Sequence, residues 1–160
     1  MRRKERNITN PETIKEILKA NHLAVVSMID GNIPYAVMMN YAPEWKGEEV
    51  RLIFHCAKAG RKFDCLNQNP FVSVFINDEN REQVINAGKE SCKWTTHYRS
   101  IILSGKIRFI EDLSSKRQMA KVFMLHYTDG EIELSEVMLN SILFLELKPQ
   151  LISGKQNQAH

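Results

Sequence analysis

The alternation of apolar and polar residues along this chain predicts a structure made mostly of β-strands. Residues 22–29 are rich in β-branched and apolar residues. Residues 33–41 form the predicted return strand after Asp30-Gly31-Asn32, a hairpin turn signal. Residues 42–49 are polar and are predicted to form a turn. Further strands are predicted at residues 50–55, 71–76, 97–110 and 141–147.

Apolar residues at helical spacing occupy several of the segments between these strands. The first predicted helix begins near Pro11, with Thr9 or Asn10 as its cap, and ends near Asn21. Other helices are predicted at residues 60–69, 113–127 and 132–139. Gly105, inside the longest strand, predicts a bulge or a sharp bend. This order of elements predicts a mainly β fold, an antiparallel barrel with helices packed outside it.

The length of 160 residues and the hydrophobic content of 43% fit one domain with its own core. We expect this domain to span residues 1–160, with residues 1–8 and 154–160 as flexible tails. The last predicted strand ends at residue 147, so residues 148–160 are expected to form a tail beyond it.

The net charge is only +3, and the basic residues are spread along the chain, which argues against a dedicated nucleic-acid-binding protein. The cluster Arg2, Arg3, Lys4 and Arg6 fits either a contact with nucleic acid or, more commonly, a solvated terminus. We expect no nucleic-acid partner.

Three cysteines, Cys56, Cys65 and Cys92, form an odd set without the density of a disulfide framework, which favours reduced thiols. The charged N-terminus is not followed by an apolar stretch, as a signal peptide would require. No apolar run approaches the length of about 20 residues that spans a bilayer. We therefore expect a cytoplasmic protein without a membrane partner.

The run Phe54–Lys62 leads from a strand end through a loop of small residues into a helix start. Its small residues Ala57, Ala59 and Gly60 would let an anion approach the backbone, and helix N-termini attract phosphate. The cations of the same run are Lys58, Arg61 and Lys62. The pattern fits a phosphate site, and it also fits a solvated basic turn.

Other polar and sulfur-containing residues leave their roles open. The cysteines, His97 and His126 match no zinc-ligand spacing, so no metal site is predicted. His55 fits either a contact with a ligand or a hydrogen bond at a strand end. Met38 and Met39 fit barrel lining, and methionine also suits a flat aromatic ligand.

Phe54–Lys62, followed by Asn69-Pro70, resembles the cofactor segment of the pyridoxamine 5′-phosphate oxidase superfamily. The resemblance is closer to the nitroimidazole-resistance branch of that superfamily. The residues that carry this closer similarity are the opening Met-Arg-Arg-Lys-x-Arg, the loop Phe-His-x-Ala-x-x-Gly-Arg-Lys, Tyr98-Arg99-Ser100 before Gly105, and the closing Ser153-Gly154-Lys155.

This resemblance implies an FMN-binding split barrel and a homodimer with the flavin at the subunit interface. The cofactor is expected to be FMN, with FAD as the other possibility. Arg61 and Lys62 would hold the phosphate, and Cys56 and Gly60 replace a threonine and a serine of the oxidases. The other residues expected at the flavin are Val37, Met38, Met39, Asn40, His55, Ala57, Trp94, Thr95 and Ser100. By the same resemblance, Ser100 lies near the position of a glutamine that contacts the flavin from the partner subunit.

The function implied is that of a flavin-dependent oxidoreductase similar to nitroimidazole reductases, which reduces a small acceptor. His55 is the expected catalytic residue, as a proton donor or a positioning group. The chain lacks the C-terminal tryptophan and arginine motif of the true oxidases, so vitamin B6 oxidation is not expected. Because Cys56 and Gly60 remove two hydroxyl groups, a non-catalytic flavin, deazaflavin or haem-binding or sensor protein stays open as an alternative.

Overall fold

A computed structural model describes residues 3–79, 83–90, 93–130 and 132–157. The helices are the 3₁₀-helix η1 (Lys4–Arg6) and the α-helices α1 (Pro11–Ala20), α2 (Arg61–Gln68), α3 (Leu113–Tyr127) and α4 (Glu136–Ser141). The strands are β1 (Asn7–Ile8), β2 (Leu23–Asp30), β3 (Ile33–Lys46), β4 (Glu49–Cys56), β5 (Phe71–Asn77), β6 (Gln83–Ile85), β7 (Thr95–Ile110), β8 (Leu143–Leu147) and β9 (Leu151–Asn157).

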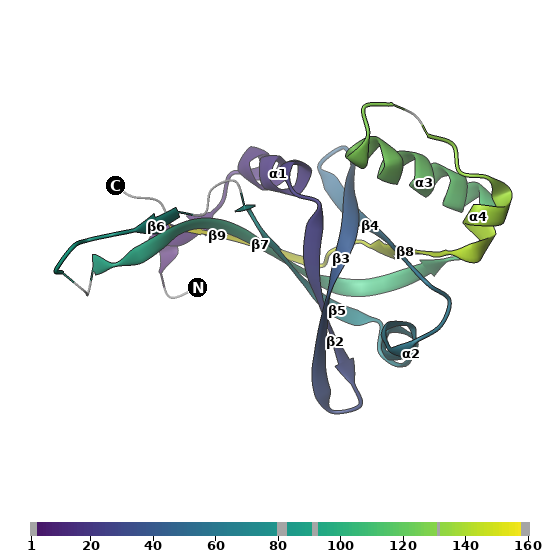
Figure 1. Cartoon of the computed structure of the whole chain (residues 1–160), viewed down its shortest axis with the longest axis horizontal. Coiled ribbons are helices and arrows are strands. Elements are labelled where there is room, and N and C mark those ends of the chain that lie inside the picture. The colour runs from purple at the N-terminus through teal and green to yellow at the C-terminus, as the bar shows by residue number, and fades with distance from the viewer. Residues whose placement is uncertain (1–2, 80–82, 91–92, 131, 158–160) are drawn as a thin grey trace.

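The strands pair in antiparallel fashion in the order β1-β9-β7-β5-β2-β3-β4-β8, and β8 also pairs with β7. The strands β7, β5, β2, β3, β4 and β8 therefore close into a ring. Helices α3 and α4 lie together on one side of this ring, α2 lies at its lower edge in the view, and β6, β7 and β9 extend away as an arm (Figure 1). This antiparallel, mainly β architecture with flanking helices confirms the fold class predicted from the sequence.

Alternate side chains of the ring strands point into one shared core. The inward residues of β2 and β5, each at most 5% exposed, are Ala24, Val26, Met28, Val72, Val74 and Ile76. A second cluster, which includes Ile53, Phe123 and Phe144, lies between the outer face of the ring and helices α3 and α4. Since fully burying one such large apolar side chain contributes about 1.5–3 kcal/mol, these two clusters hold the helices against the ring.

Strand β3 is longer than the sequence pattern predicts. The turn expected at residues 42–49 is wrong, because β3 continues to Lys46 and pairs with β4 as far as Glu49. The turn itself is short and contains Gly47 at φ +64°. Ala42 is fully buried and Trp45 packs against the core, so tertiary packing extends a strand whose sequence is locally polar.

The C-terminal segment is a strand, so the prediction of a tail at residues 148–160 is wrong for most of its length. Strand β9 pairs along β7, and its Gly154 lies opposite Ile8 of β1. A Cβ atom at Gly154 would lie 2.6 Å from the Cβ of Ile8, so only glycine allows this approach. Residues 7–8 and 154–157, expected to be flexible, therefore hold each other in the sheet.

Gly105 marks the point where β7 changes its neighbour. Ser104 still pairs with β9, whereas Ile107 pairs with Leu147 of β8. A Cβ atom at Gly105 would lie 3.0 Å from the carbonyl oxygen of Lys148, so the glycine allows the close approach that this change requires. No helix in the described part of the chain combines the length and the apolar character that crossing a bilayer requires.

Candidate functional site

Strands β3 and β4 separate at the residues that the sequence singles out. Their pairing runs from Lys46 opposite Glu49 to Tyr41 opposite Phe54 and stops there. Beyond that point β3 stays paired with β2, while His55 and Cys56 pair with β8. In the described structure, the edge of β3 over residues 33–40 that faces β4 therefore has no strand partner. We call this opening the β3–β4 fork.

The four β3 residues predicted to flank a flavin ring line one arm of the fork. Their side chains alternate between the two faces of the strand, as period-two geometry requires. Val37 packs against the core and Met39 is 5% exposed, whereas Met38 is 62% exposed and Asn40 is exposed as well. The side chains of Val37 and Met39 point into the core. A ligand in the fork would therefore meet the backbone groups of these two residues rather than their side chains.

His55, the predicted catalytic residue, lies on the other arm of the fork. Its ring is exposed on the outer face of β4, with its centroid 4.9 Å from that of Phe123 in an edge-on contact and 6.4 Å from that of Phe144. Partial burial and, second, the positive charge of Lys62 lower the pKa of His55. The imidazole is therefore mainly neutral at pH 7, with one nitrogen able to donate and the other able to accept a hydrogen bond.

The loop that follows β4 leads into α2 through Gly60. This residue caps α2 at φ +102°, a conformation that favours glycine, and no side chain caps the helix. A Cβ atom built at Gly60 would meet nothing within 4 Å, so there is open space above the loop. The first-turn N–H groups of α2 and the exposed Ala57 therefore border this space.

The predicted phosphate-binding cations point in different directions. Lys62 lies near His55 and Cys56, because its charge lowers the pKa values of both groups. The Arg61 guanidinium instead donates from Nε to Asp30 Oδ2 at 2.7 Å and stacks 4.3 Å above the ring of Tyr35. Arg61 thus ties α2 to the β2–β3 hairpin and keeps only its terminal nitrogens for a ligand.

Cys56 is part of the core rather than of the open loop. It is 5% exposed, and burial raises the pKa of its thiol. A neutral thiol inside the core is a poor nucleophile, so only the backbone of Cys56 can contact a ligand in the fork. The described residues hold no group of three or more His, Cys, Asp or Glu side chains placed to bind a metal ion. Cys92 lies outside the residues that the structure describes.

Within one chain, the structure does not bring Trp94, Thr95 and Ser100 to the fork. Trp94 donates from Nε1 to the Gly88 carbonyl at 2.9 Å, and Thr95 Oγ1 accepts from Asn157 Nδ2 at 3.0 Å. Ser100 lines a cavity of about 390 Å³ formed by β5, β7 and β9. Thr95 and Ser100 belong to β7, which extends with β6 and β9 into the arm (Figure 1).

The sequence between residues 10 and 156 matches the model of a family described as pyridoxamine 5′-phosphate oxidase. The chain belongs to this family. None of the curated proteins matches the chain in sequence.

Solved structures share the fold of this pyridoxamine 5′-phosphate oxidase family member. A candidate 5-nitroimidazole antibiotic resistance protein from Bacteroides thetaiotaomicron VPI-5482 is 23% identical, with a TM-score of 0.81 over 94% of this chain and 86% of that chain. The flavocytochrome Anf3 from Azotobacter vinelandii is 20% identical, with a TM-score of 0.82 over 99% and 72%. The FAD and heme binding protein from Mycobacterium smegmatis is 20% identical, with a TM-score of 0.83 over 96% and 74%. The predicted family and its split-barrel fold are thus confirmed.

The sequence analysis missed an apolar row on the outer face of this family member. Met38 lies opposite Val25, Val25 opposite Phe75, and Phe75 opposite Ile102. Met38, Phe75 and Ile102 are 62%, 39% and 43% exposed. We call these residues the outer row. The signal was present in the sequence, because β2 and β5 carry apolar residues at both odd and even positions, whereas a strand with one solvated face alternates.

Arg99 also has a role that the sequence did not reveal. Its side chain is 8% exposed and donates from Nε to Asp78 Oδ2 at 2.7 Å and from Nη2 to Glu16 Oε1 at 2.9 Å. Asp78 is 1% exposed, so this ion pair is buried between β7, α1 and the end of β5. Arg99 therefore holds the segment next to Ser100 in place.

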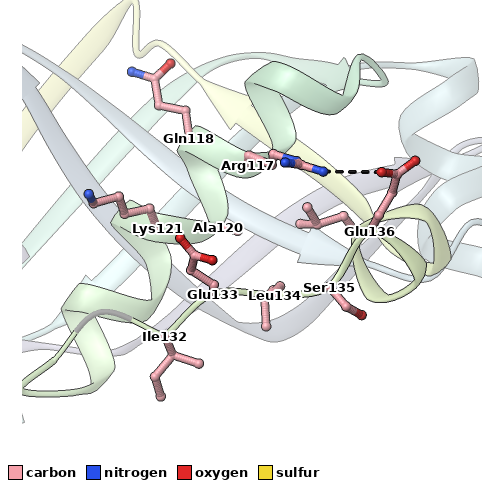
Figure 2. Close-up of a pocket in the computed structure, with 10 residues that line it drawn as sticks. Arg117, Gln118, Ala120, Lys121, Ile132, Glu133, Leu134, Ser135 and Glu136 are labelled. Carbon is pink, nitrogen blue, oxygen red and sulfur yellow. Dashed lines mark hydrogen bonds and ion pairs between the residues drawn. The ribbon is translucent and has the colours of Figure 1, made fainter.

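A larger cavity, of about 470 Å³, lies away from the fork between α3 and the segment that leads into α4 (Figure 2). An ion pair at 3.2 Å between Arg117 and Glu136 crosses it, and Lys121 and Glu133 add one charge of each sign. None of the residues predicted to bind the cofactor lines this cavity. Its lining includes two cations and two carboxylates, so its charges are balanced.

Proposed function

We propose that this chain is a flavin-dependent oxidoreductase that reduces a small acceptor at the β3–β4 fork, with FMN or FAD as its cofactor. The observation that carries this proposal is the fork itself, where the β3 edge has no partner in the described structure and the helix that follows β4 starts at Gly60 without a side-chain cap. Membership of the pyridoxamine 5′-phosphate oxidase family makes a flavin the expected occupant.

The residues at the fork fit the chemistry of a flavin. The unpaired backbone groups of residues 37–40 would bind the polar edge of the flavin ring. The N–H groups at the start of α2, together with Lys62 and the free nitrogens of Arg61, would bind the phosphate. Basic residues in the first turn of a helix are unfavourable beside its dipole, and a bound dianion would offset that cost.

The chain's own contribution to the reaction comes from His55. A bound flavin would supply the electrons. Phe123 and Phe144 hold the imidazole of His55 against the outer face of β4, beside the point where the strands part. Because its pKa is lowered, His55 would act mainly as a neutral hydrogen-bond donor that orients the acceptor.

We also propose that the active form is a homodimer, with the outer row at the interface. Met38 belongs both to the fork and to this row, and the Ser100 cavity opens on the same sheet face. A second copy packed on this face would bury the exposed apolar side chains and bring its own Ser100 towards the fork, with Trp94 and Thr95 following on β7. Contiguous exposed apolar surface of this kind is typical of protein interfaces.

The similarity to the candidate 5-nitroimidazole antibiotic resistance protein supports a nitro group on a small heteroaromatic ring as the acceptor. The test is anaerobic turnover of a 5-nitroimidazole by the prereduced protein. The wild type should exceed the rate of free flavin, and His55→Ala should lower the rate while flavin stays bound. A rate equal to that of free flavin would overturn the reductase assignment.

A second candidate function is the binding of haem. Its support is His55, because an exposed, neutral imidazole is the form that ligates haem iron. Its other support is the similarity to a flavocytochrome and to an FAD and heme binding protein. The visible spectrum of the purified protein separates the two candidates. Flavin bands alone favour the reductase, whereas a Soret band that His55→Ala abolishes favours haem binding.

A further inference from the structure

A separate cavity of about 390 Å³ borders the loop between β4 and α2. It is bounded by α2, the end of β7 and the region where α4 leads into β8, on the right-hand side of Figure 1. Lys58 of the loop lines it, as does Leu143, which pairs with Cys56 of β4. Because β8 pairs with the edge of β4 opposite to β3, the cavity lies on the β8 side of β4 and adjoins the loop of residues 57–60.

Two lysines give this cavity a positive wall. Lys58 is exposed, whereas Lys116 of α3 is 3% exposed. The Lys116 ammonium donates to the carbonyl oxygens of Leu139 and Ile142, each at 3.2 Å. An ammonium has three N–H groups, so these bonds leave one for a ligand. No carboxylate in the described residues lies within ion-pair distance of Lys116, so its buried positive charge would favour an anion.

The rest of the cavity combines an aromatic wall with polar groups of different kinds. The rings of Phe63 and Phe109 are 5.7 Å apart at 54° to each other. The exposed side chains of Asn67 and Asn140 present amides that both donate and accept hydrogen bonds. Glu111 adds one carboxylate, which only accepts when ionised.

This combination matches the parts of an adenosine phosphate. Lysines bind phosphate, an aromatic wall packs against a purine, and amides pair with the polar edge of the base. A carboxylate accepts hydrogen bonds from ribose hydroxyls, as in dinucleotide-binding folds. The volume lies at the lower end of the range of roughly 300–1,000 Å³ for small-molecule pockets.

We propose that this cavity binds the adenosine phosphate half of FAD, so that the chain takes the dinucleotide in preference to FMN. The inference rests on the proposed function, because it places the flavin phosphate at the start of α2. Lys58, in the loop before this helix start, lines the cavity, so the second phosphate and the adenosine would be held there.

The test is titration of the flavin-free full-length protein with FAD and with FMN, followed by fluorescence and calorimetry. FAD should bind at least about tenfold more tightly than FMN, the effect of one charge-assisted hydrogen bond. Asn67→Asp and Asn140→Asp remove the amide donors offered to the base and add a negative charge to the cavity, so each should weaken FAD binding by about tenfold, with FMN binding unchanged. The matched control is Gln68→Glu, which makes the same charge change at the neighbouring exposed residue of α2.

Titration of ADP into the flavin-loaded protein tests whether the adenosine phosphate half of bound FAD already fills the cavity. ADP should bind the FMN-loaded protein and not the FAD-loaded protein. Equal affinities for FAD and FMN, or equal binding of ADP to both loaded forms, would overturn the inference and leave the flavin site intact. Failure of both flavins to bind would refute the proposed function together with this inference.

Discussion

The β3–β4 fork draws its residues from two neighbouring strands and the loop into α2, whereas the outer row takes one residue from each of four strands. The fork has polar backbone, Lys62 and an uncapped helix start, and the outer row has exposed apolar side chains. The fork therefore has the features of a ligand site, and the outer row those of a protein interface. Met38 connects them, which predicts that breaking the interface also weakens the ligand site.

The largest expected effect follows from placing a charge in the outer row. Phe75→Glu would bury one carboxylate per subunit without a partner, and an uncompensated buried charge costs about 3–5 kcal/mol. We expect the variant to be monomeric by light scattering and to bind flavin much more weakly than the wild type.

The matched control for this variant is Val137→Glu, since Val137 is 80% exposed on α4, away from the row. It should remain dimeric and bind flavin normally. A Phe75→Glu protein that stays dimeric would place the interface elsewhere, and a monomer with normal flavin affinity would show that the fork is complete within one chain.

The next largest effect is on the free energy of unfolding, which should fall more when a buried ion pair is removed than when an exposed one is removed. Arg99→Met leaves Asp78, 1% exposed, without its cation, so the free energy of unfolding should fall by about 3 kcal/mol. Arg117→Met breaks the ion pair with Glu136, in which both side chains are about 60% exposed, and should cost less than about 1 kcal/mol. Urea denaturation measures both values. Equal losses would mean that the Arg99 pair does not stabilise the β7 end of the molecule.

Comparison of the two regions also explains what the sequence could predict. The run from Phe54 to Lys62 is contiguous, and its strand end, small-residue loop and helix start follow from local rules. The α1 cap, where Asn10 accepts from the Glu12 N–H at 2.9 Å, is local too. Such features could be predicted because neighbours in sequence determine them.

Features that depend on distant partners were missed. Strand β9 contains only two large apolar residues, Leu151 and Ile152, and is stabilised by its pairing with β7 and by Ile8. The fork itself depends on the β3–β4 pairing ending at Phe54 while β4 stays paired with β8 as far as Cys56, which no local pattern encodes. Arg61 was predicted to hold phosphate from its position, but its ion pair with Asp30 is a contact across 31 residues of sequence.

That ion pair predicts unequal roles for the two cations at the start of α2. Lys62→Met should weaken flavin binding by about tenfold or more, the effect of losing one charge-assisted hydrogen bond. Arg61→Met should have a smaller effect, because the guanidinium already has Asp30 as its partner. Lys46→Met, at an exposed lysine at the end of β3, is the control and should change nothing. If Arg61→Met weakened flavin binding more than Lys62→Met, the phosphate would be assigned to the side of α2 that faces the β2–β3 hairpin.

The smallest expected effect is electrostatic and tests whether Lys62 faces the fork. Burial and the charge of Lys62 lower the pKa of His55, so removing that charge in Lys62→Met should raise the pKa of His55, as followed by NMR titration. His126 is an internal control, because burial and His22 lower its pKa, and Lys62 does not contribute.

The sign of the pH dependence follows from the same shift. A histidine whose pKa is lowered by folding binds a proton more readily in the unfolded chain. Its neutral form therefore contributes stability above the ordinary pKa of about 6.5, and that contribution is lost as the pH falls through the lower folded value. Lys62→Met narrows the gap between the folded and unfolded pKa values, so the loss of stability between pH 7 and pH 5 should become smaller. An unchanged pKa of His55 in this variant would mean that Lys62 does not lie at the fork. The helix start and Arg61 would then be the groups that bind phosphate.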